Sequence, residues 1–375
     1  MTETAFERRT RACQQRLRDG AGDLAVLFPS RNLFYATGFD EEPQERHLFL
    51  FVPAEGDPTF LVPDLYGSQV ESESWVEDVR TWSDGEDPVA AVEDVVADLS
   101  VPADGHVLVD DTMWALFTQD LEAALPDASF GLASVVFDEL RVRKDEAELD
   151  ALRRAGQLAD EVSVALRELG EEVVGWTEAE LAAEIESRLV SGGGESVSFD
   201  VIAGSGPNGA MPHHTHGDRE IERGDPVVLD FGAYVDGYPG DQTRTVVFAG
   251  EPPERFAEVH GTVREALEAG VSAVEPGVTA ESVDRAAREV IEDAGYGERF
   301  VHRTGHGVGL DVHEPPYIVD GNGTELEPGM VFSVEPGVYL DGEFGVRIED
   351  LVVVTEDGCE RLNESPHGWR VGDSE

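Results

Sequence analysis

The chain has 375 residues, of which 79 are acidic and 27 basic, so its formal net charge is −52. A surface this acidic repels phosphate backbones, which excludes a nucleic-acid partner. Because 41% of the residues are apolar, the chain is not a disordered acidic tail, and it is long enough for two domains with sizeable cores.

The acidic residues are spread along the chain instead of gathered in one run, and Lys144 is the only lysine. At molar salt the screening length falls to about 3 Å, which removes most of the self-repulsion of such a surface. We therefore expect a halophilic protein from a salt-accumulating microbe; an acidic surface for a basic partner would concentrate the charge. Cys13 and Cys359 imply no disulfide framework.

Targeting signals are not found in the sequence. Residues 1–18 lack the apolar core of a signal peptide. No apolar run approaches the roughly 20 residues that span a bilayer. The sequence therefore predicts a cytoplasmic protein with no membrane partner.

Residues 1–138 are predicted to form an α/β domain. Strand-like apolar runs alternate here with helical segments, and the clearest runs are Leu24–Phe28, His47–Val52 and Thr59–Pro63. This part of the sequence has no cluster of metal-ligating residues and no phosphate-binding loop. We expect a linker at residues 139–146, a second domain at residues 147–364 and a tail at residues 365–375.

The second domain is predicted to begin with helices. Apolar residues recur at helical spacing from Leu149 to Leu169, and Thr177 with Glu180 is a plausible capping box for the next helix. Two more helices are expected at Pro253–Ala273 and Ala280–Ala294. The strands of this domain carry the side chains that indicate a chemistry.

The first such strands lie on either side of an Asp236-Gly237 turn, in the stretch Val227–Phe248. Asp230 and Asp241 flank this turn, so they should lie opposite or diagonal to each other on neighbouring strands, and their side chains can reach one shared point. An aspartate beside glycine at a strand end is usually only a turn residue, which is the structural alternative for Asp241.

The glutamates repeat this design. The apolar stretches Val331–Leu340 and Phe344–Val354 flank a turn at Gly342, and Glu335 and Glu349 are equidistant from that turn. A hairpin would therefore place the two glutamates face to face. Charged groups are rarely buried without a partner, so two glutamates in apolar strands favour a functional site.

A histidine completes the set. His306 lies in Gly305-His306-Gly307, where glycines on both sides let the backbone pass close to a crowded centre. Two aspartates, one histidine and two glutamates are a full ligand set for a pair of divalent metals, and they favour Mn²⁺, Co²⁺ or Zn²⁺ over softer choices. The sequence therefore predicts a two-metal hydrolase with these metal ligands: Asp230, Asp241, His306, Glu335 and Glu349.

The order and spacing of these residues resemble the pita-bread metallopeptidases, the family of methionine aminopeptidase, aminopeptidase P and prolidase. The resemblance spans about residues 141–363, and its prolidase and aminopeptidase P branch is indicated by three stretches: Met211–His214, His302–His306 and Val312–Pro316. Asn32–Phe39 and Leu140–Leu149 resemble the N-terminal domain of creatinase and prolidase and the entry into the catalytic domain. The resemblance implies a creatinase-like α/β domain followed by an α+β pita-bread domain, whose curved antiparallel sheet is covered by helices.

The resemblance also implies roles for individual residues. Two divalent ions, Mn²⁺ or Co²⁺ before Zn²⁺, would activate a bridging hydroxide, and Glu335 would take the proton of the attacking water. His313 would stabilise the oxyanion and His213 would steady the substrate near the leaving nitrogen, neither of them as a ligand. Arg347 should point to the same face as Glu349 and would either pair with a substrate carboxylate or clamp a ligand carboxylate.

Several substrates stay open at this stage. The chain is most similar to a Xaa-Pro dipeptidase (prolidase) acting on proline-containing peptides, and a small Xaa-Pro aminopeptidase is an alternative. A pita-bread hydrolase of a non-peptide amide or small metabolite, such as a compatible solute, is a second class. A binding protein without activity is disfavoured by the intact ligand set. The expected assembly is a homodimer.

Overall fold

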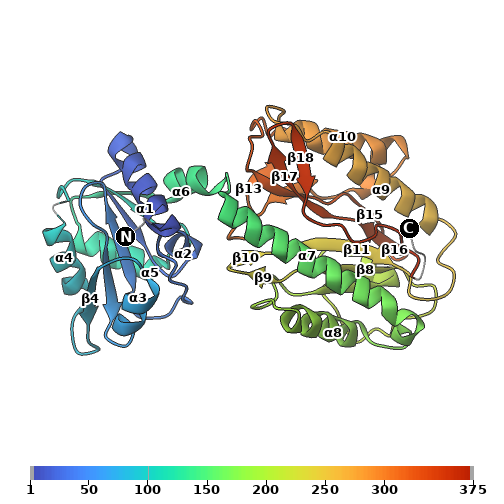
Figure 1. Ribbon diagram of the computed structural model, residues 1–375, viewed down its shortest axis with the longest axis horizontal. Coiled ribbons are helices and arrows are strands. Elements are labelled where there is room, and N and C mark those ends of the chain that lie inside the picture. The colour runs from blue at the N-terminus through green and yellow to red at the C-terminus, as the bar shows by residue number, and fades with distance from the viewer. Residues whose placement is uncertain (1–3, 100, 372–375) are drawn as a thin grey trace. The chain divides into compact units, whose positions relative to one another are not determined.

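The computed structural model describes residues 4–99 and 101–371, and the chain divides into two compact units, Met1–Arg141 and Val142–Glu375. Figure 1 shows the strands and helices of each unit. Among the described residues, no helix is long and apolar enough to cross a membrane.

The N-terminal unit is an α/β domain built on one mixed six-stranded sheet, in the order β4-β3-β2-β1-β5-β6. β2 pairs with β1 and β3 in antiparallel fashion, and the other pairs are parallel. The strands are β1 (Leu24–Leu27), β2 (Phe49–Pro53), β3 (Thr59–Pro63), β4 (Asp78–Trp82), β5 (His106–Val109) and β6 (Ser129–Leu132). The helices are α1 (Ala5–Arg16), continued by a π-helical turn at Leu17–Ala21, α2 (Arg31–Thr37), α3 (Gly67–Glu73), α4 (Pro88–Asp98), α5 (Ala115–Ala124) and α6 (Ser134–Arg141).

Four long helices cover the strands of the second unit: α7 (Glu146–Leu169), α8 (Glu178–Ser191), α9 (Phe256–Ser272) and α10 (Ala280–Asp293). The capping box of Thr177 and Glu180 forms at the start of α8, as predicted, and Asp145 with Glu148 forms a second one at α7. In Figure 1, α7 and α8 lie on one side of the strands and α9 and α10 on the other. Short 3₁₀ turns occupy Gly170–Val173, Gly206–Ala210 and Gly297–Arg299.

All strand pairs of this unit are antiparallel within the described residues. One sheet has the order β11-β8-β7, a second has the order β13-β12-β14-β17-β18, and β9-β10 and β15-β16 are two-stranded. The strands are β7 (Ile202–Ser205), β8 (Val227–Phe231), β9 (Tyr234–Val235), β10 (Tyr238–Pro239), β11 (Gln242–Val246), β12 (Gly305–Gly307), β13 (Glu314–Ile318), β14 (Val331–Val334), β15 (Gly337–Leu340), β16 (Phe344–Arg347), β17 (Asp350–Thr355) and β18 (Gly358–Arg361).

Two apolar cores hold these layers together. One packs Leu166 of α7 and Leu181 of α8 against Leu229 of β8. The other packs Val263 of α9 against Phe332 of β14. The helices thus bury both faces of the strands, which is the arrangement that the pita-bread resemblance implies.

Residues 365–371, here called the C-terminal segment, lie against these strands, although the sequence suggested a tail from residue 365. The amide of Val247 donates to the carbonyl of Trp369 at 2.9 Å. Arg244 Nη2 donates to the Ser365 carbonyl at 3.1 Å, and His367 Nε2 lies 3.0 Å from Asp350 Oδ2. The segment therefore contributes to the structure that carries β11 and β17.

Candidate metal centre

The two aspartates lie where the turn prediction placed them. Asp236 (φ 49°) and Gly237 (φ 77°) form the tight turn between β9 and β10, and both adopt the positive φ that such a turn requires. β8 pairs with β11 so that Asp230 is opposite Thr243, and Asp241 directly precedes β11. The two aspartates are therefore diagonal neighbours, and both side chains line one cavity.

The two glutamates face each other between the β14–β17 strand pair and the β15–β16 strand pair. Val334 of β14 is opposite Asp350 of β17, and Gly337 of β15 is opposite Arg347 of β16. The same register on both sides places Glu335 opposite Glu349, as the hairpin prediction requires.

The strands that carry the glutamates are interrupted at the ligand positions, since β14 ends at Val334 and β15 begins at Gly337. Pro336 has no N–H to continue a ladder. The amide of Glu335 donates to the Thr304 carbonyl at 2.7 Å, and the amide of Glu349 donates to the Thr243 carbonyl at 3.1 Å. Both backbones therefore bond to neighbouring strands at the ligand positions instead of to each other, which joins several strands around the carboxylates.

His306 reaches the same point from β12, between β13 and β14. A Cβ on Gly305 would collide with the Ser333 carbonyl, and one on Gly307 with the Pro315 carbonyl, so the close approach demands both glycines. His306 Nδ1 lies 3.2 Å from the Gly307 carbonyl, which assigns its proton to Nδ1. Nε2 is then unprotonated and has a lone pair for a metal ion. It lies 3.6 Å from Asp241 Oδ2 and 3.5 Å from Glu335 Oε1.

The electrostatics of this cluster fit bound divalent cations. Ligand atoms of Asp241, His306 and Glu349 all lie within 4.8 Å of one another. Burial and the neighbouring carboxylates raise the pKa of Asp241 and Glu349 well above the usual range, and burial raises the pKa of Glu335 to about 7. Asp230 Oδ1 is buried and has no hydrogen-bond partner among the described residues. Cations with a preference for oxygen ligands would satisfy this atom and offset the repulsion.

Arg347 clamps a predicted ligand. Its Nη2 donates to Asp230 Oδ2 at 2.6 Å, and its Nη1 donates to the hydroxyl of Tyr339 at 2.9 Å and to the Pro212 carbonyl at 3.3 Å. Of the two predicted roles, the clamp on a ligand carboxylate is the one that these contacts favour. The residue is 3% exposed, and the Nε of its guanidinium donates to Thr243 Oγ1 at 3.2 Å.

The ligand candidates open into a cavity of about 690 Å³, which His213 and His313 also line. His313 packs edge-on against His306, with 4.1 Å between the ring centroids. Burial and Arg303 lower the pKa of His313, so its imidazole is neutral at neutral pH. His213 is exposed and lies on the segment that follows the 3₁₀ turn at Gly206–Ala210.

A buried carboxylate anchors the segment that carries His213. Glu178 accepts hydrogen bonds from the amide and hydroxyl of Ser205, both at 2.7 Å, and from Asn208. His214 Nε2 lies 2.8 Å from the same carboxylate, so this histidine positions the segment and does not enter the cavity lining.

Two cavity residues were given no role in the sequence analysis. His302 accepts a hydrogen bond from the Tyr339 hydroxyl at 2.8 Å, while its Nδ1 lies 2.7 Å from the Arg303 carbonyl. The guanidinium carbon of Arg303 lies 4.5 Å from the centroid of the Tyr317 ring. Among the described residues, no carboxylate pairs with Arg303. The signal was present, because both lie in the His302–His306 stretch that carried the resemblance.

Comparisons with known proteins agree over nearly the whole chain. Residues 150–356 match the model of metallopeptidase family M24, and residues 9–143 match the creatinase/prolidase N-terminal domain. A probable dipeptidase PepE of Mycobacterium bovis is 45% identical over 346 residues, which cover 91% of this chain and 90% of the relative. An Xaa-Pro dipeptidase of Lactobacillus delbrueckii subsp. lactis is 36% identical over 362 residues, which cover 96% of this chain and 97% of the relative.

A solved structure gives the same result. A recombinant prolidase of Thermococcus sibiricus superimposes with a TM-score of 0.92 at 39% identity, covering 98% of this chain and all of that one. The predicted fold class, a creatinase-like domain followed by a pita-bread domain, is confirmed. The chain belongs to metallopeptidase family M24.

Proposed function

We propose that this enzyme hydrolyses the peptide bond of Xaa-Pro dipeptides with a hydroxide activated at a dinuclear metal centre. The metal ligands would be Asp230, Asp241, His306, Glu335 and Glu349. Manganese or cobalt suits four carboxylates and one imidazole, and zinc is compatible with the same set. Support comes from the buried carboxylate cluster at the cavity and from the relative named Xaa-Pro dipeptidase.

The side chains around the centre have separate roles in this proposal. When bound, two divalent ions supply Lewis-acid chemistry that activates water near neutral pH. Glu335 takes the proton of the attacking water, since burial brings its pKa to about 7 and the Ser333 hydroxyl lies 3.4 Å from its Oε1. His313 donates to the developing oxyanion, and His213 steadies the substrate near the leaving nitrogen.

Arg347 acts as a positioning residue in this scheme, because its donors hold Asp230, Tyr339 and the Pro212 carbonyl. A different cation must therefore meet the carboxylate of a dipeptide. Arg303 has the required properties, since it lines the cavity, is half-buried, and pairs with no carboxylate among the described residues. This arginine is the observation that favours a dipeptidase over an aminopeptidase, whose substrates continue beyond the proline.

The experiment compares substrates that differ in one charge. Metal-loaded enzyme in molar KCl is assayed on an Xaa-Pro dipeptide, on the same dipeptide with an amidated C-terminus, and on an Xaa-Pro-Yaa tripeptide. The dipeptide should have the highest kcat/KM. Arg303→Gln should raise KM for the dipeptide by about 10–100-fold, the cost of one hydrogen bond to a charged group, and change KM little for the amide.

The matched control is Arg299→Gln, which removes a neighbouring arginine outside the cavity lining. Equal wild-type rates on the dipeptide and its amide would contradict a dipeptidase. Turnover of an amide-bearing osmolyte with no turnover of any Xaa-Pro peptide would replace the peptidase proposal altogether.

A further inference from the structure

Lys144 is the only lysine among the 27 basic residues of the chain, and it forms a buried ion pair. It lies in the second unit, two residues before α7, and is 6% exposed. Its Nζ donates at 2.7 Å to Oε1 of Glu314, 170 positions further along the chain, which is 6% exposed as well. Because the pair is removed from solvent, dissolved salt screens it little.

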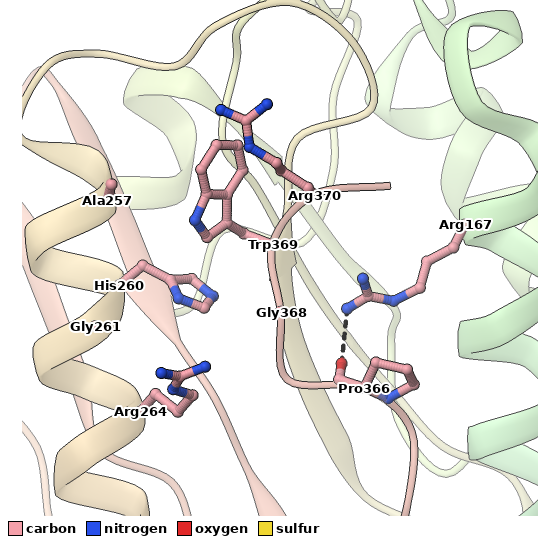
Figure 2. Close-up of a pocket in the computed structure, with 9 residues that line it drawn as sticks. All are labelled: Arg167, Ala257, His260, Gly261, Arg264, Pro366, Gly368, Trp369 and Arg370. Carbon is pink, nitrogen blue, oxygen red and sulfur yellow. Dashed lines mark hydrogen bonds between the residues drawn. The ribbon is translucent and has the colours of Figure 1, made fainter. Parts of the chain in front are cut away.

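Figure 2 shows arginines of the second unit that are used differently. Arg167 Nη2 donates to the Pro366 carbonyl at 2.7 Å, the dashed line in the figure. The guanidinium carbon of Arg370 lies 4.5 Å from the centroid of the Trp369 ring, and its Nη2 pairs with Glu251 at the surface. A guanidinium spreads its donors over a plane, whereas an ammonium is a compact point charge. The single lysine thus lies where a buried carboxylate has a compact counterion.

The carboxylate of Glu314 fills the turn that carries His313. A Cβ on Gly309 would collide with this carboxylate, so the backbone of the turn passes directly over it. The amide of Asp311 donates to Glu314 Oε2 at 3.4 Å, and the amide of Gly309 donates to the Asp311 carbonyl at 3.1 Å. The side chain of Glu314 therefore occupies the inside of the turn, and Lys144 supplies the opposite charge.

The orientation of His313 depends on this turn. His313 directly precedes Glu314, and its exposed side chain lines the cavity of the candidate metal centre. Its ring packs edge-on against His306, with 4.1 Å between the ring centroids. An exposed ring is not packed on all sides, so the course of the backbone decides where its nitrogens point. A contact that fixes the Glu314 side chain therefore also helps to fix the imidazole of His313.

We propose that Lys144 is a positioning residue, whose ion pair with Glu314 holds the turn in the conformation that aims His313 at the reacting carbonyl. The inference rests on the proposed function, in which His313 donates to the developing oxyanion. Neither Lys144 nor Glu314 belongs to the cavity lining, so both act through His313. Loss of the ion pair should misdirect the imidazole and leave the binding of peptide and metal unchanged.

The test uses the metal-loaded full chain in molar KCl and measures kcat and KM on an Xaa-Pro dipeptide. In Lys144→Met, kcat should fall by about 10–100-fold, the cost of misplacing a catalytic group by about 1 Å, while KM and metal content stay at wild-type values. The matched control is Arg143→Gln, which removes the neighbouring cation and its exposed ion pair with Glu327, and its kcat should equal that of the wild type. Wild-type kcat in Lys144→Met, or equal losses in the two variants, would overturn the proposal.

A double-mutant cycle separates positioning from general stabilisation. In the His313→Ala background, Lys144→Met should lower kcat no further, because the group that Lys144 positions is already absent. A purely structural role would lower kcat by the same factor in both backgrounds, and that outcome would also overturn the proposal. If Lys144→Met fails to fold, Lys144→Met/Glu314→Gln, which leaves no unpaired charge, takes its place in the same cycle.

The failure of this inference can be distinguished from the failure of the proposed function. Wild-type turnover in His313→Ala would overturn the role of His313 and, with it, the role of Lys144. A large loss of kcat in His313→Ala together with wild-type kcat in Lys144→Met would overturn only the positioning by Lys144.

Discussion

At the scale of single residues, the metal centre is a set of charges that cannot all be present without their counterions. Burial and mutual repulsion raise the pKa of Asp241, Glu335 and Glu349 together. Among the described residues, Arg347 is the only cation that donates to the side chain of a predicted ligand, Asp230, since Arg244 donates to the backbone carbonyl of Glu349. The side chains therefore prepare a site whose proper partner is a divalent metal.

The role of Glu335 is open to a direct test. Glu335→Ala removes both a metal ligand and the proton acceptor, so we expect kcat to fall by at least the roughly 10²–10⁴-fold that general bases contribute. Metal analysis of the wild-type chain should find close to two divalent ions. Glu343→Ala, at the exposed turn of the same hairpin, should behave as wild type. Wild-type turnover in Glu335→Ala would show that another group takes the proton.

His313 should separate chemistry from metal loading. It packs against His306 but is not placed as a ligand, so His313→Ala should keep both metal ions. Turnover should fall by about 10²–10³-fold, the usual loss for an oxyanion donor. The two measurements are kcat on an Xaa-Pro dipeptide and metal content by mass spectrometry. Loss of metal with retained turnover per metal ion would contradict this assignment.

At the scale of helices and strands, local patterns predicted most elements. The helices expected at Pro253–Ala273 and Ala280–Ala294 are α9 and α10, with ends shifted by up to three residues. The turn at Asp236-Gly237 was predictable because positive φ selects a few residue types. The register around Gly342 was predictable as well. Side chains alternate between the two faces of a strand, so the equal distance of Glu335 and Glu349 from the turn places these glutamates opposite each other.

What the sequence did not predict depends on contacts between distant segments. The strand breaks at Glu335 and Glu349 arise because both amides bond to Thr304 and Thr243, which no local pattern reveals. The use of Arg347 as a clamp was left open because Asp230 lies 117 positions earlier in the chain. The role of the C-terminal segment was missed for the same reason, since its partners are on β11 and β17.

Helix α9 carries a pH-dependent contribution to stability through His260. Its folded-state pKa of about 3 lies below the unfolded value of 6.5, so the unfolded chain takes up the proton first. This contribution is complete above about pH 6.5 and decreases as the pH falls toward 3, by at most about 1.4 kcal/mol per pH unit.

Urea unfolding from pH 7 to pH 4.5 in phosphate-free buffer measures this contribution. His260→Asn should lose stability less steeply with acid than the wild type does, because all other titrating groups are shared. Parallel slopes for the two chains would show that His260 accepts a proton in the folded state without penalty.

At the scale of the whole molecule, the net negative charge is the main determinant of how stability depends on salt. With 79 acidic against 27 basic residues, repulsion within the folded chain at low salt is large, and molar salt screens it. We expect the unfolding midpoint and the activity to rise toward molar KCl. Added Mn²⁺ in dilute buffer should restore the midpoint only partly, because it neutralises the metal centre and leaves the surface as it was. A melting series in KCl with a flat or falling midpoint would contradict adaptation to salt.

The position of the C-terminal segment has a consequence for biosynthesis. The first unit, Met1–Arg141, contains its own sheet and core, so it can fold while the rest of the chain is being translated. The second unit cannot, because Arg244 and Asp350 find their partners Ser365 and His367 only after those residues have left the ribosome. The strands that carry the ligands therefore gain these contacts only once residue 367 has been translated, and we expect metal loading to follow that point.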